Sequence, residues 1–420
     1  MFNITALAAR ITKFTNKTKF LIAYSGGMDS HVLLHTMHEI RATNPLIIIR
    51  AIHIHHGLSE NADSWLTHCA KICSALDINL TVKFVTIPFT KKNHKHNVEA
   101  LAREARYEEF AKTITEDEVL LTAHHLDDQA ETVLLQLFRG CGPKGLSAMP
   151  IHKGLAQGSL LRPLLEFSRK ELFKYAQQNQ LSWIEDESNE HIGYDRNFIR
   201  HQLMPVISQR WSNILKTLVR SAKHCASTIE VLDTFVHKDY LYVKGINNDT
   251  LSISKILTFD LPRQNSVIRY WLQKLKLPMP SSIKLQHIIT DVLHCRHDAQ
   301  PIVHWQNVEI RRYRDDLYAI NSFKIPPVNL ILPWDISANL ELPHNLGMLT
   351  LELLKSHHIS NYAKNITVRF RYPGAKYKVK GRSGTHSLTK LFQEKGIPPW
   401  QRNYTPLIFQ GEELIDIVSI

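Results

Sequence analysis

The stretch that decides the fold is Lys19-Phe-Leu-Ile-Ala-Tyr-Ser-Gly-Gly-Met-Asp-Ser30. Residues 20–24 form an apolar run that is long enough for a buried strand and too short for a helix. Two glycines interrupt the run, and Asp29-Ser30 then opens a segment with apolar residues at helical spacing. Glycine lets backbone N–H groups approach an anion, and the first helical turn leaves its own N–H groups unpaired. The stretch therefore predicts a phosphate-binding loop.

The loop does not match the commonest nucleotide-binding patterns. G-x-x-x-x-G-K-[ST] requires a lysine and a longer loop, and G-x-G-x-x-G is absent here. Ser25-Gly-Gly-Met-Asp-Ser30 instead resembles the S-G-G-x-D-S loop of the ATP pyrophosphatases, which cleave ATP between its α and β phosphates. This resemblance implies that ATP is bound by Ser25, Gly26, Gly27, Met28, Asp29 and Ser30. A tight turn that binds nothing is the alternative interpretation.

The length and composition indicate a soluble protein of several domains. A chain of 420 residues exceeds one ordinary domain, and 44% hydrophobic residues suffice for packed cores. No apolar run reaches the length of a membrane span and no secretory signal is evident, so we expect a cytoplasmic protein without membrane contact. Five scattered cysteines suit a reducing compartment. The net charge of +12 favours a polyanionic partner.

Strands and helices are expected to alternate after the loop. The expected strands are residues 46–55, 80–87, 119–123 and 162–165, the expected helices are 61–76, 98–113 and 168–178, and residues 91–97 are expected to form an exposed loop. This alternation predicts a parallel sheet with helices on both faces. Ligands of such sheets bind at the carboxyl ends of the strands, so the glycine loop, His55-His56 and His124-His125 should meet in one cleft.

Three acids, Asp127, Asp128 and Glu131, follow the strand expected at residues 119–123. Asp128 and Glu131 are three residues apart and share one face of a helix. Carboxylates beside an ATP site could hold Mg²⁺ or an ammonium group. Capping of the helix by acids is the alternative, and it is compatible with a site. Further along, Arg196 and Arg200 are one helical turn apart and suit a phosphate clamp, an RNA contact or a solvated surface.

The second half of the chain is expected to contain two more domains. Residues 216–325 are predicted to be mostly helical, residues 326–349 to form a proline-rich linker region, and residues 350–420 to form a small basic α+β domain. The expected aromatic anchors of the helical part are Trp211, Tyr270, Trp271 and Trp305.

The C-terminal part is strongly basic. Between Arg369 and Arg402 there are nine Lys or Arg residues and one acid, Glu394, with aromatic residues interleaved. Charge of one sign with planar side chains is typical of nucleic-acid binding, whereas the glycines and prolines disfavour an amphipathic membrane helix. The expected RNA contacts are Arg369, Arg371, Lys378, Lys380, Arg382, Lys390 and Arg402. A solvated basic face is the alternative.

Taken together, the motifs resemble those of the tRNA(Ile)-lysidine synthase family. The matching segments are Ser25-Gly-Gly-Met-Asp-Ser30, His55-His-Gly-Leu-Ser59, Ala102-Arg-Glu-Ala-Arg-Tyr107, Ala123-His-His-Leu-Asp-Asp-Gln-Ala-Glu-Thr132, Arg139-Gly140, Arg162-Pro-Leu-Leu165, Asp186-Glu-Ser-Asn189, Arg196-Asn-Phe-Ile-Arg200 and Ile397-Pro-Pro-Trp-Gln-Arg402. The match is dense over residues 20–210 and looser in the C-terminal part. There Ala375 stands where the family has an acid, and His386-Ser387 stands where basic residues are usual.

The resemblance implies an enzyme that modifies the cytidine at the first anticodon position of the isoleucine tRNA with the anticodon CAU. The cytidine O2 attacks the α-phosphate of ATP, pyrophosphate leaves, and the ε-amine of free L-lysine then displaces AMP from C2. The implied catalytic residues are Asp29, Asp128 and Glu131, of which Asp128 and Glu131 hold the lysine, while Asp29 and Asp127 hold Mg²⁺.

The resemblance also implies which part of the chain performs which function. Residues 1–215 would be the PP-loop adenylating domain, and residues 216–325 and 350–420 would bind tRNA. Phosphate or RNA contacts are implied for Arg106, Arg139, Arg196 and Arg200. The family's examples suggest a homodimer or a monomer.

Two other functions fit parts of the sequence. A PP-loop tRNA thiolase would share the ATP loop, but the cytidine thiolases carry C-x-x-C for an iron–sulfur cluster, and Cys69 and Cys73 are one residue too far apart. A catalytically silent RNA-binding protein of the same fold would not need the pair Asp128 and Glu131, and this pair is intact.

Overall fold

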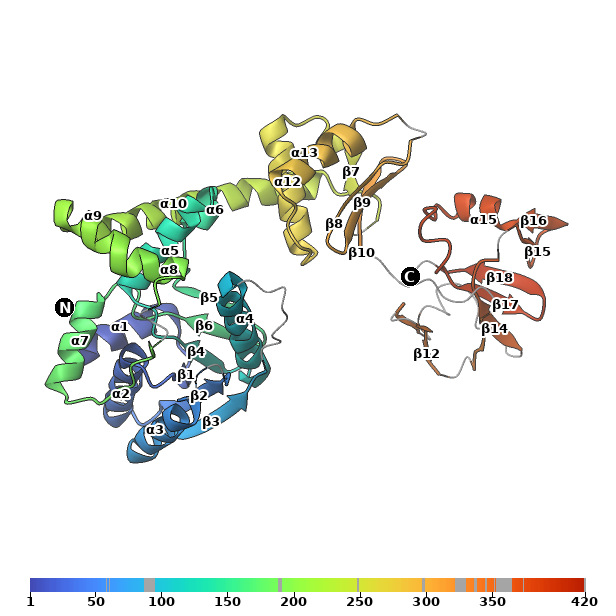
Figure 1. Ribbon diagram of the computed structural model, residues 1–420. Coiled ribbons are helices and arrows are strands. Elements are labelled where there is room, and N and C mark those ends of the chain that lie inside the picture. The colour runs from blue at the N-terminus through green and yellow to red at the C-terminus, as the bar shows by residue number, and fades with distance from the viewer. Residues whose placement is uncertain are drawn as a thin grey trace. The chain divides into compact units, whose positions relative to one another are not determined.

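The chain forms two compact units, Met1–Leu232 (unit 1) and Asp233–Ile420 (unit 2), which are described separately. The computed structural model describes residues 1–57, 59, 61–86, 95–187, 191–247, 249–296, 299–321, 330–335, 338–343, 346–350, 352, 365–372 and 374–418. Figure 1 shows the order of the elements along the chain. Among the described residues, no helix is long and apolar enough to cross a membrane.

Unit 1 is built on a six-stranded sheet with the order β3-β2-β1-β4-β6-β5 (Figure 1). Its strands are β1 (Lys19–Ala23), β2 (Ile48–His55), β3 (Asn79–Phe84), β4 (Glu118–Leu121), β5 (His152–Leu155) and β6 (Gly158–Leu161). All neighbours pair in parallel except β5 and β6, which are antiparallel. The central residues Phe20, Leu21 and Ile22 are almost fully buried, as expected for a strand with helices on both sides.

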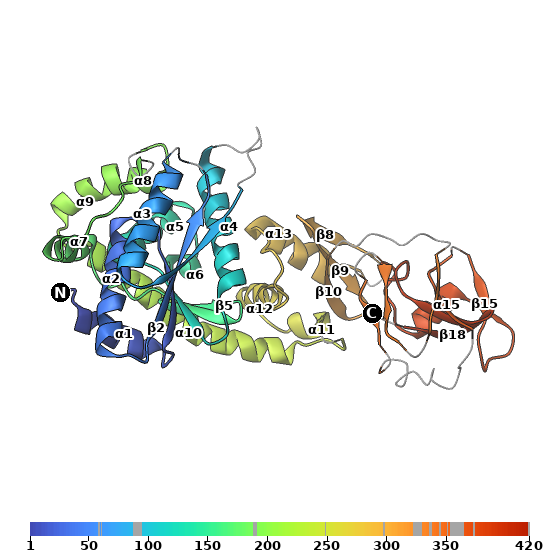
Figure 2. The same cartoon turned by 90° about the horizontal axis from the view of Figure 1, so that it is seen from below.

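Helices cover both faces of this sheet (Figures 1 and 2). The helices described in this unit before α10 are α1 (Ile4–Phe14), α2 (Met28–Thr43), α3 (Ala62–Ala75), α4 (Lys95–Thr113), α5 (Leu126–Phe138), α6 (Pro143–Leu146), α7 (Arg169–Gln178), α8 (Asp195–Phe198), a π-helical turn (Ile199–Leu203) and α9 (Met204–Arg210). Apolar residues of α1, α2 and α7 share one core with β1, and Phe110 and Ile114 pack with Leu21 on the other face. The predicted parallel α/β architecture is confirmed.

Two local predictions for unit 1 are wrong. The strand expected at residues 162–165 is β6, which ends at Leu161, and Pro163 follows without an N–H group for the ladder. Helix α4 begins at Lys95, although residues 91–97 were expected to be a loop. The polar residues at its start suit a first helical turn as well as a loop. Residues 91–94 lie outside the described residues.

The first part of unit 2 combines helices with an antiparallel sheet. The elements are α11 (Ile253–Ile256), α12 (Leu261–Lys274), α13 (Ser282–His287), a π-helical turn (Ile288–Leu293), β7 (Leu251–Ser252), β8 (Ile302–Trp305), β9 (Val308–Tyr313) and β10 (Asp316–Asn321), after the long helix α10 (Ile214–Tyr242), which contains the division between the units. The four strands have the order β7-β10-β9-β8.

The helical prediction for this part is therefore incomplete. The alternation of buried Val308 and Ile310 with polar residues marks β9, but Arg311 and Arg312 at its end mask that pattern in the sequence. Trp271 is fully buried and Trp305 nearly so, as predicted, with Tyr270 packed against their core. Trp211 is 60% exposed, so it is not a core anchor.

The last part of unit 2 is a small α+β assembly. A four-stranded sheet has the order β11-β14-β17-β18, and the described residues add the hairpins β12-β13 and β15-β16 and helix α15. The elements are β11 (Ile331–Pro333), β12 (Leu340–Glu341), β13 (Met348–Leu349), β14 (Ile366–Arg369), β15 (Lys376–Lys378), β16 (Thr385–Ser387), α15 (Leu388–Glu394), β17 (Leu407–Gln410) and β18 (Glu413–Ile417). Phe392 of α15 packs on Phe409 of the sheet, and both are fully buried.

Candidate active site

The glycine loop lies at the carboxyl end of β1 and leads directly into α2. Gly26 has φ +88°, and a Cβ there would lie 2.7 Å from Ile184 Cδ1 and 2.9 Å from Cys69 Sγ. Only glycine therefore fits this position. Gly27 precedes α2, and no hydrogen bond from a described side chain caps the helix. The strand, glycine turn and helix start predicted from the sequence are present, and phosphate binding by the loop stays a prediction.

Hydrogen bonds hold the loop in one conformation. Ser30 Oγ donates to the carbonyl of Gly27 at 2.9 Å and lies 3.1 Å from Ser25 Oγ. The N–H group of Ile184 donates to the carbonyl of Gly26 at 3.0 Å. Met28, which was predicted to bind ATP, has its side chain in the core of unit 1, so its backbone is the part suited to a phosphate.

His125 connects the loop to the acids of α5. Its Nε2 atom lies 3.6 Å from Asp29 Oδ2 and 3.5 Å from Asp128 Oδ2, and its Nδ1 atom lies 3.5 Å from Asp127 Oδ2. The side chain is buried, which opposes a charge, but the facing carboxylates outweigh burial and raise the pKa of His125 to about 10. The facing carboxylates therefore favour the protonated form of His125. The sequence places it in the cleft, directly before the acids, but assigns it no role.

Asp128 and Glu131 lie buried on one face of α5, where Arg196 and Arg200 pair with both. Arg196 Nε is 2.8 Å from Glu131 Oε2, and Arg196 Nη2 is 3.0 Å from Asp128 Oδ1. Arg200 Nε is 2.7 Å from Glu131 Oε1, and Arg200 Nη2 is 3.0 Å from Asp128 Oδ1. Burial opposes ionisation, but the charges of His125 and Arg196 hold the pKa of Asp128 well below its usual range.

The charges of this cluster nearly balance. Its carboxylates belong to Asp29, Asp127, Asp128 and Glu131, and its positive charges to His125, Arg196 and Arg200. One negative charge is left over, so the cluster can accept a further cation. The structure thus brings the predicted acids together, and it places Arg196 and Arg200 against them.

Two of the acids also cap helices. Asp128 Oδ2 accepts a hydrogen bond from the N–H group of His125 at 3.0 Å, at the start of α5. Asp127 Oδ2 accepts one from the N–H group of Arg169 at 2.8 Å, at the start of α7. Capping and a charged site are therefore combined in the same residues, as the sequence allowed.

Asp29 is the residue best suited to a divalent cation. Its Oδ1 atom is buried and has no hydrogen-bond partner among the described residues. The described part of the chain contains no group of three or more His, Cys, Asp or Glu side chains that could hold a metal alone. Mg²⁺ at phosphate sites commonly takes one or two carboxylates and completes its shell with phosphate oxygens and water. Asp29 and Asp127, both against the His125 ring, fit that mode.

The other arginines predicted to bind phosphate or RNA lie on the surface of unit 1. Arg106 is exposed on α4, and burial together with the nearby Arg106 charge lowers the pKa of His56. Arg139 is exposed at the end of α5.

Most basic residues predicted to bind RNA in unit 2 already have partners. Arg369 pairs with Glu412, Lys378 with Glu413, and Arg382 with Glu394, while Arg371 donates to Asn403 and Lys380 to Gln410. Arg402 is buried, and its Nε atom donates to the carbonyl of Ile397. Lys390 is exposed and makes no ion pair with a described residue.

The sheet, the S-G-G-x-D-S loop and the adjoining acids define an ATP pyrophosphatase of the PP-loop class. The PP-loop domain family matches residues 3–207. The TilS substrate binding domain matches residues 251–318, and the TilS substrate C-terminal domain matches residues 366–420.

Relatives over the whole chain identify the family. The tRNA(Ile)-lysidine synthase of Coxiella burnetii is 40% identical over 421 residues, which cover 100% of this chain and 92% of the relative. Those of Shigella flexneri and Escherichia coli O157:H7 are each 42% identical, covering 96% and 94% of this chain and 92% and 91% of the relatives. The chain belongs to the tRNA(Ile)-lysidine synthase family.

A solved structure is similar at the level of fold only. The U34-tRNA thiolase from Methanococcus maripaludis is 17% identical and has a TM-score of 0.43, covering 53% of this chain and 78% of the thiolase. A similarity this low has no bearing on the reaction.

Proposed function

We propose that this chain uses ATP to attach L-lysine to C2 of the cytidine at the first anticodon position of the isoleucine tRNA with the anticodon CAU, releasing AMP and pyrophosphate. The observation that carries the proposal is the position of His125. Its Nε2 atom lies within 3.6 Å of both Asp29 of the glycine loop and Asp128 of the acid pair. One imidazole therefore separates the phosphate site from the cation site, so an activated cytidine and an amine would meet in one small space.

The loop serves the first step, in which the cytidine O2 attacks the α-phosphorus of ATP and pyrophosphate leaves. The N–H groups of Gly26, Gly27 and the first turn of α2 would bind the leaving pyrophosphate. Mg²⁺ bound at Asp29 and Asp127 would supply neutralisation of the charge that develops on pyrophosphate.

The acid pair serves the second step, in which the ε-amine of lysine attacks C2 and AMP leaves. The carboxylates of Asp128 and Glu131 would hold the ammonium group of lysine. Asp128 and Glu131 would together anchor the ammonium and accept its proton, with Arg196 and Arg200 keeping both carboxylates in position.

Cysteine chemistry of the kind that a tRNA thiolase needs is disfavoured. Cys69 and Cys73 are both buried and unpaired. Burial raises the pKa of Cys69 to about 12 and that of Cys73 to about 11. Thiols with a pKa raised in this way are poor nucleophiles at neutral pH.

The test is product formation from ATP, labelled lysine and the purified isoleucine tRNA. We expect lysine in the tRNA with AMP and pyrophosphate released, and loss of transfer in Asp29→Ala and Glu131→Gln. Glu116→Gln, an exposed acid outside the site, is the matched control and should behave as the wild type. Pyrophosphate release without lysine transfer would show that the nucleophile of the second step is a compound other than lysine. No ATP cleavage would leave an RNA-binding protein.

A further inference from the structure

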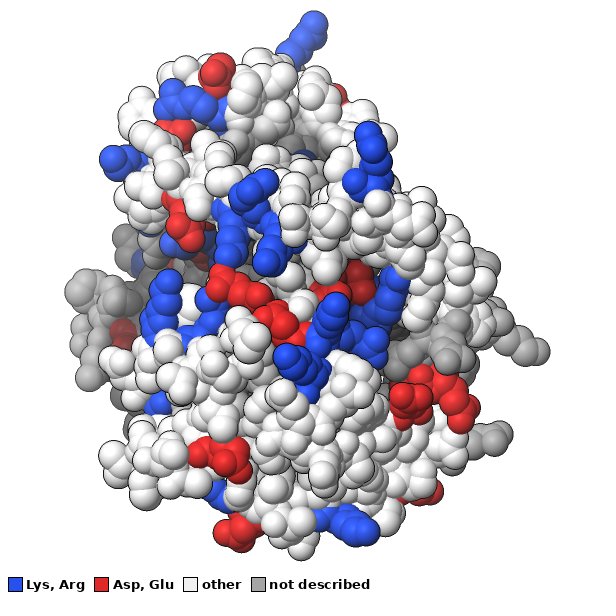
Figure 3. Space-filling view, turned by 90° about the vertical axis from the view of Figure 1, so that its left-hand side faces the viewer, with Lys and Arg blue, Asp and Glu red and all other residues white. Residues whose placement is uncertain are grey.

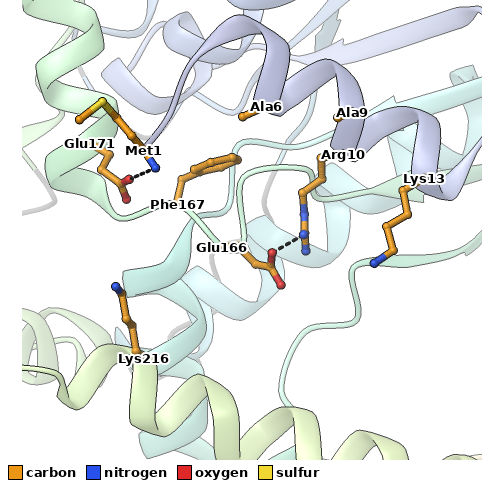
Figure 4. Close-up of a pocket in the computed structure, with 9 residues that line it drawn as sticks. All are labelled: Met1, Ala6, Ala9, Arg10, Lys13, Glu166, Phe167, Glu171 and Lys216. Carbon is orange, nitrogen blue, oxygen red and sulfur yellow. Dashed lines mark hydrogen bonds and ion pairs between the residues drawn. The ribbon is translucent and has the colours of Figure 1, made fainter.

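Two hollows in unit 1 share the turn that leads into α7. One has a volume of about 420 Å³ and is lined by residues that include Arg10, Lys13, Glu166 and Lys216 (Figure 4). The other has a volume of about 480 Å³, and its lining includes Met28 and Asp127 of the candidate active site. Glu166 and Phe167 line the first hollow, and Arg169 and Lys170 line the second. The turn before α7 therefore connects the first hollow to the second hollow, which borders the candidate active site.

The first hollow carries positive charge that its acids do not balance. Arg10 and Lys223 both form ion pairs with Glu166. Lys13 of α1 and Lys216 of α10 reach the hollow from opposite sides (Figure 4), and neither makes an ion pair within the described part of the chain. Lys and Arg side chains gather around a hollow on this side of the molecule in Figure 3, with acids between them. This arrangement suits an anion held between two ammonium groups.

The second hollow is lined by two basic residues, two acids (Asp127 and Glu185) and two planar side chains. Arg169 and Lys170 are exposed, and no described acid pairs with their side chains. Phe173 and Trp183 line the same hollow with ring centroids 6.0 Å apart, and Phe173 is 41% exposed. Aromatic rings do not contribute to the binding of a free phosphate, whereas unpaired RNA has both phosphates that bind cations and bases that stack on aromatic rings.

We infer that the two hollows form a track for the unpaired strand of the tRNA anticodon loop. Lys13 and Lys216 bind one backbone phosphate, Arg169 and Lys170 bind the next one toward the active site, and Phe173 stacks on a base beside the modified cytidine. The inference rests on the proposed function, because it is the cytidine substrate that brings this strand to Asp127 and Met28.

The first test removes Lys13 and Lys216, the two lysines that line the first hollow. The double variant Lys13→Ala/Lys216→Ala changes two exposed residues, so its melting temperature should equal that of the wild type. Loss of one phosphate contact should lower the slope of log K against log salt by about one and raise the tRNA KM roughly five- to tenfold at 0.1 M salt. The kcat at saturating tRNA and the KM for ATP should not change. Lys71→Ala, an exposed lysine of α3 outside both hollows, is the matched control.

The second test separates stacking from charge. Phe173→Ala should raise the tRNA KM roughly tenfold while leaving the salt slope unchanged, because stacking releases no counterions. Phe173→Tyr keeps a ring and should restore the wild-type KM.

The outcomes distinguish this inference from the proposed function. A raised KM for ATP in the double variant would mean that the lysines hold the phosphates of ATP, and the inference would fail. Wild-type tRNA KM and salt slope in both variants would also overturn it, while lysine transfer by the same enzymes would leave the function intact. If the wild type transfers no lysine, the salt slope of direct tRNA binding still decides whether the track exists.

Discussion

The α5 cluster of unit 1 and the basic surface of the C-terminal part both consist of ion pairs, but they differ in burial. In the α5 cluster, Glu131 is 2% exposed and both of its oxygens face guanidinium groups. In the C-terminal part, Lys378 pairs with Glu413 and Arg382 with Glu394 where water reaches all four groups. A buried pair is costly to break, whereas an exposed pair contributes little.

The comparison shows why a count of basic residues misjudges free charge. One acid lies between Arg369 and Arg402, but β17 and β18 bring Glu412, Glu413 and Asp416 to the same surface. The lysines of the first hollow in unit 1 come from two stretches that are also basic: residues 1–28 contain four Lys or Arg and no acid, and residues 196–229 contain six and no acid. Among the described residues, folding pairs much of the basic charge of the C-terminal part but leaves Lys13 and Lys216 without ion pairs.

The largest effect is expected from Glu131→Gln in the buried cluster. This change removes one of the two carboxylates proposed to hold the lysine ammonium and to accept its proton. We expect lysine transfer in a single turnover to fall at least a hundredfold, which is within the usual range for a general base. Asp63→Asn on α3 changes a largely exposed acid and is the control. Transfer within threefold of the wild type would show that the pair is structural.

The free energy of unfolding of the Arg196→Met variant tests how strongly burial of an ion pair affects the cost of breaking it. The variant leaves Asp128 and Glu131 buried with Arg200 and His125 as their remaining partners. Removing one partner of a buried pair costs about 3 kcal/mol or more, to be read from the unfolding transition of unit 1 in urea. Arg382→Met removes one partner of an exposed pair in unit 2 and should leave the urea midpoint of unit 2 unchanged. Equal shifts in the two variants would contradict the role of burial.

The sequence predicts the local features of unit 1 well because they depend on neighbours in the chain. The run from Phe20, the glycine turn and the acid pair of α5 all follow from short spacings. The pairing of Glu131 with Arg196 joins residues 65 positions apart, which no spacing indicates. The sheet β7-β10-β9-β8 of unit 2 was not predicted, because its strands are short and β9 ends in arginines, whereas the α+β character of the C-terminal part was predicted. His125 was undervalued because its importance comes from Asp29, which folding brings to it.

Lys390 and Lys378 provide a matched pair for the exposed surface. Both lie in the C-terminal part, but Lys378 pairs with Glu413, whereas Lys390 makes no ion pair with a described residue. If RNA uses this surface, Lys390→Ala should weaken tRNA binding severalfold at 0.1 M salt, and Lys378→Ala should weaken it less. Filter binding over a salt series measures both. A greater loss for Lys378→Ala would show that RNA displaces Glu413.

The smallest effect is expected from Glu413→Gln, which frees Lys378 without removing a basic residue. An acid that competes with phosphate for the same ammonium lowers RNA affinity, so its loss should strengthen tRNA binding about twofold at low salt. The gain should vanish near 0.5 M salt, because screening removes the attraction of an exposed charge. In a Lys378→Ala background the same change should gain nothing beyond the general loss of one negative charge. A gain of equal size in both backgrounds would show that Glu413 acts through the overall field and not through Lys378, and the ion pairs of this surface would then not determine which lysines RNA can use.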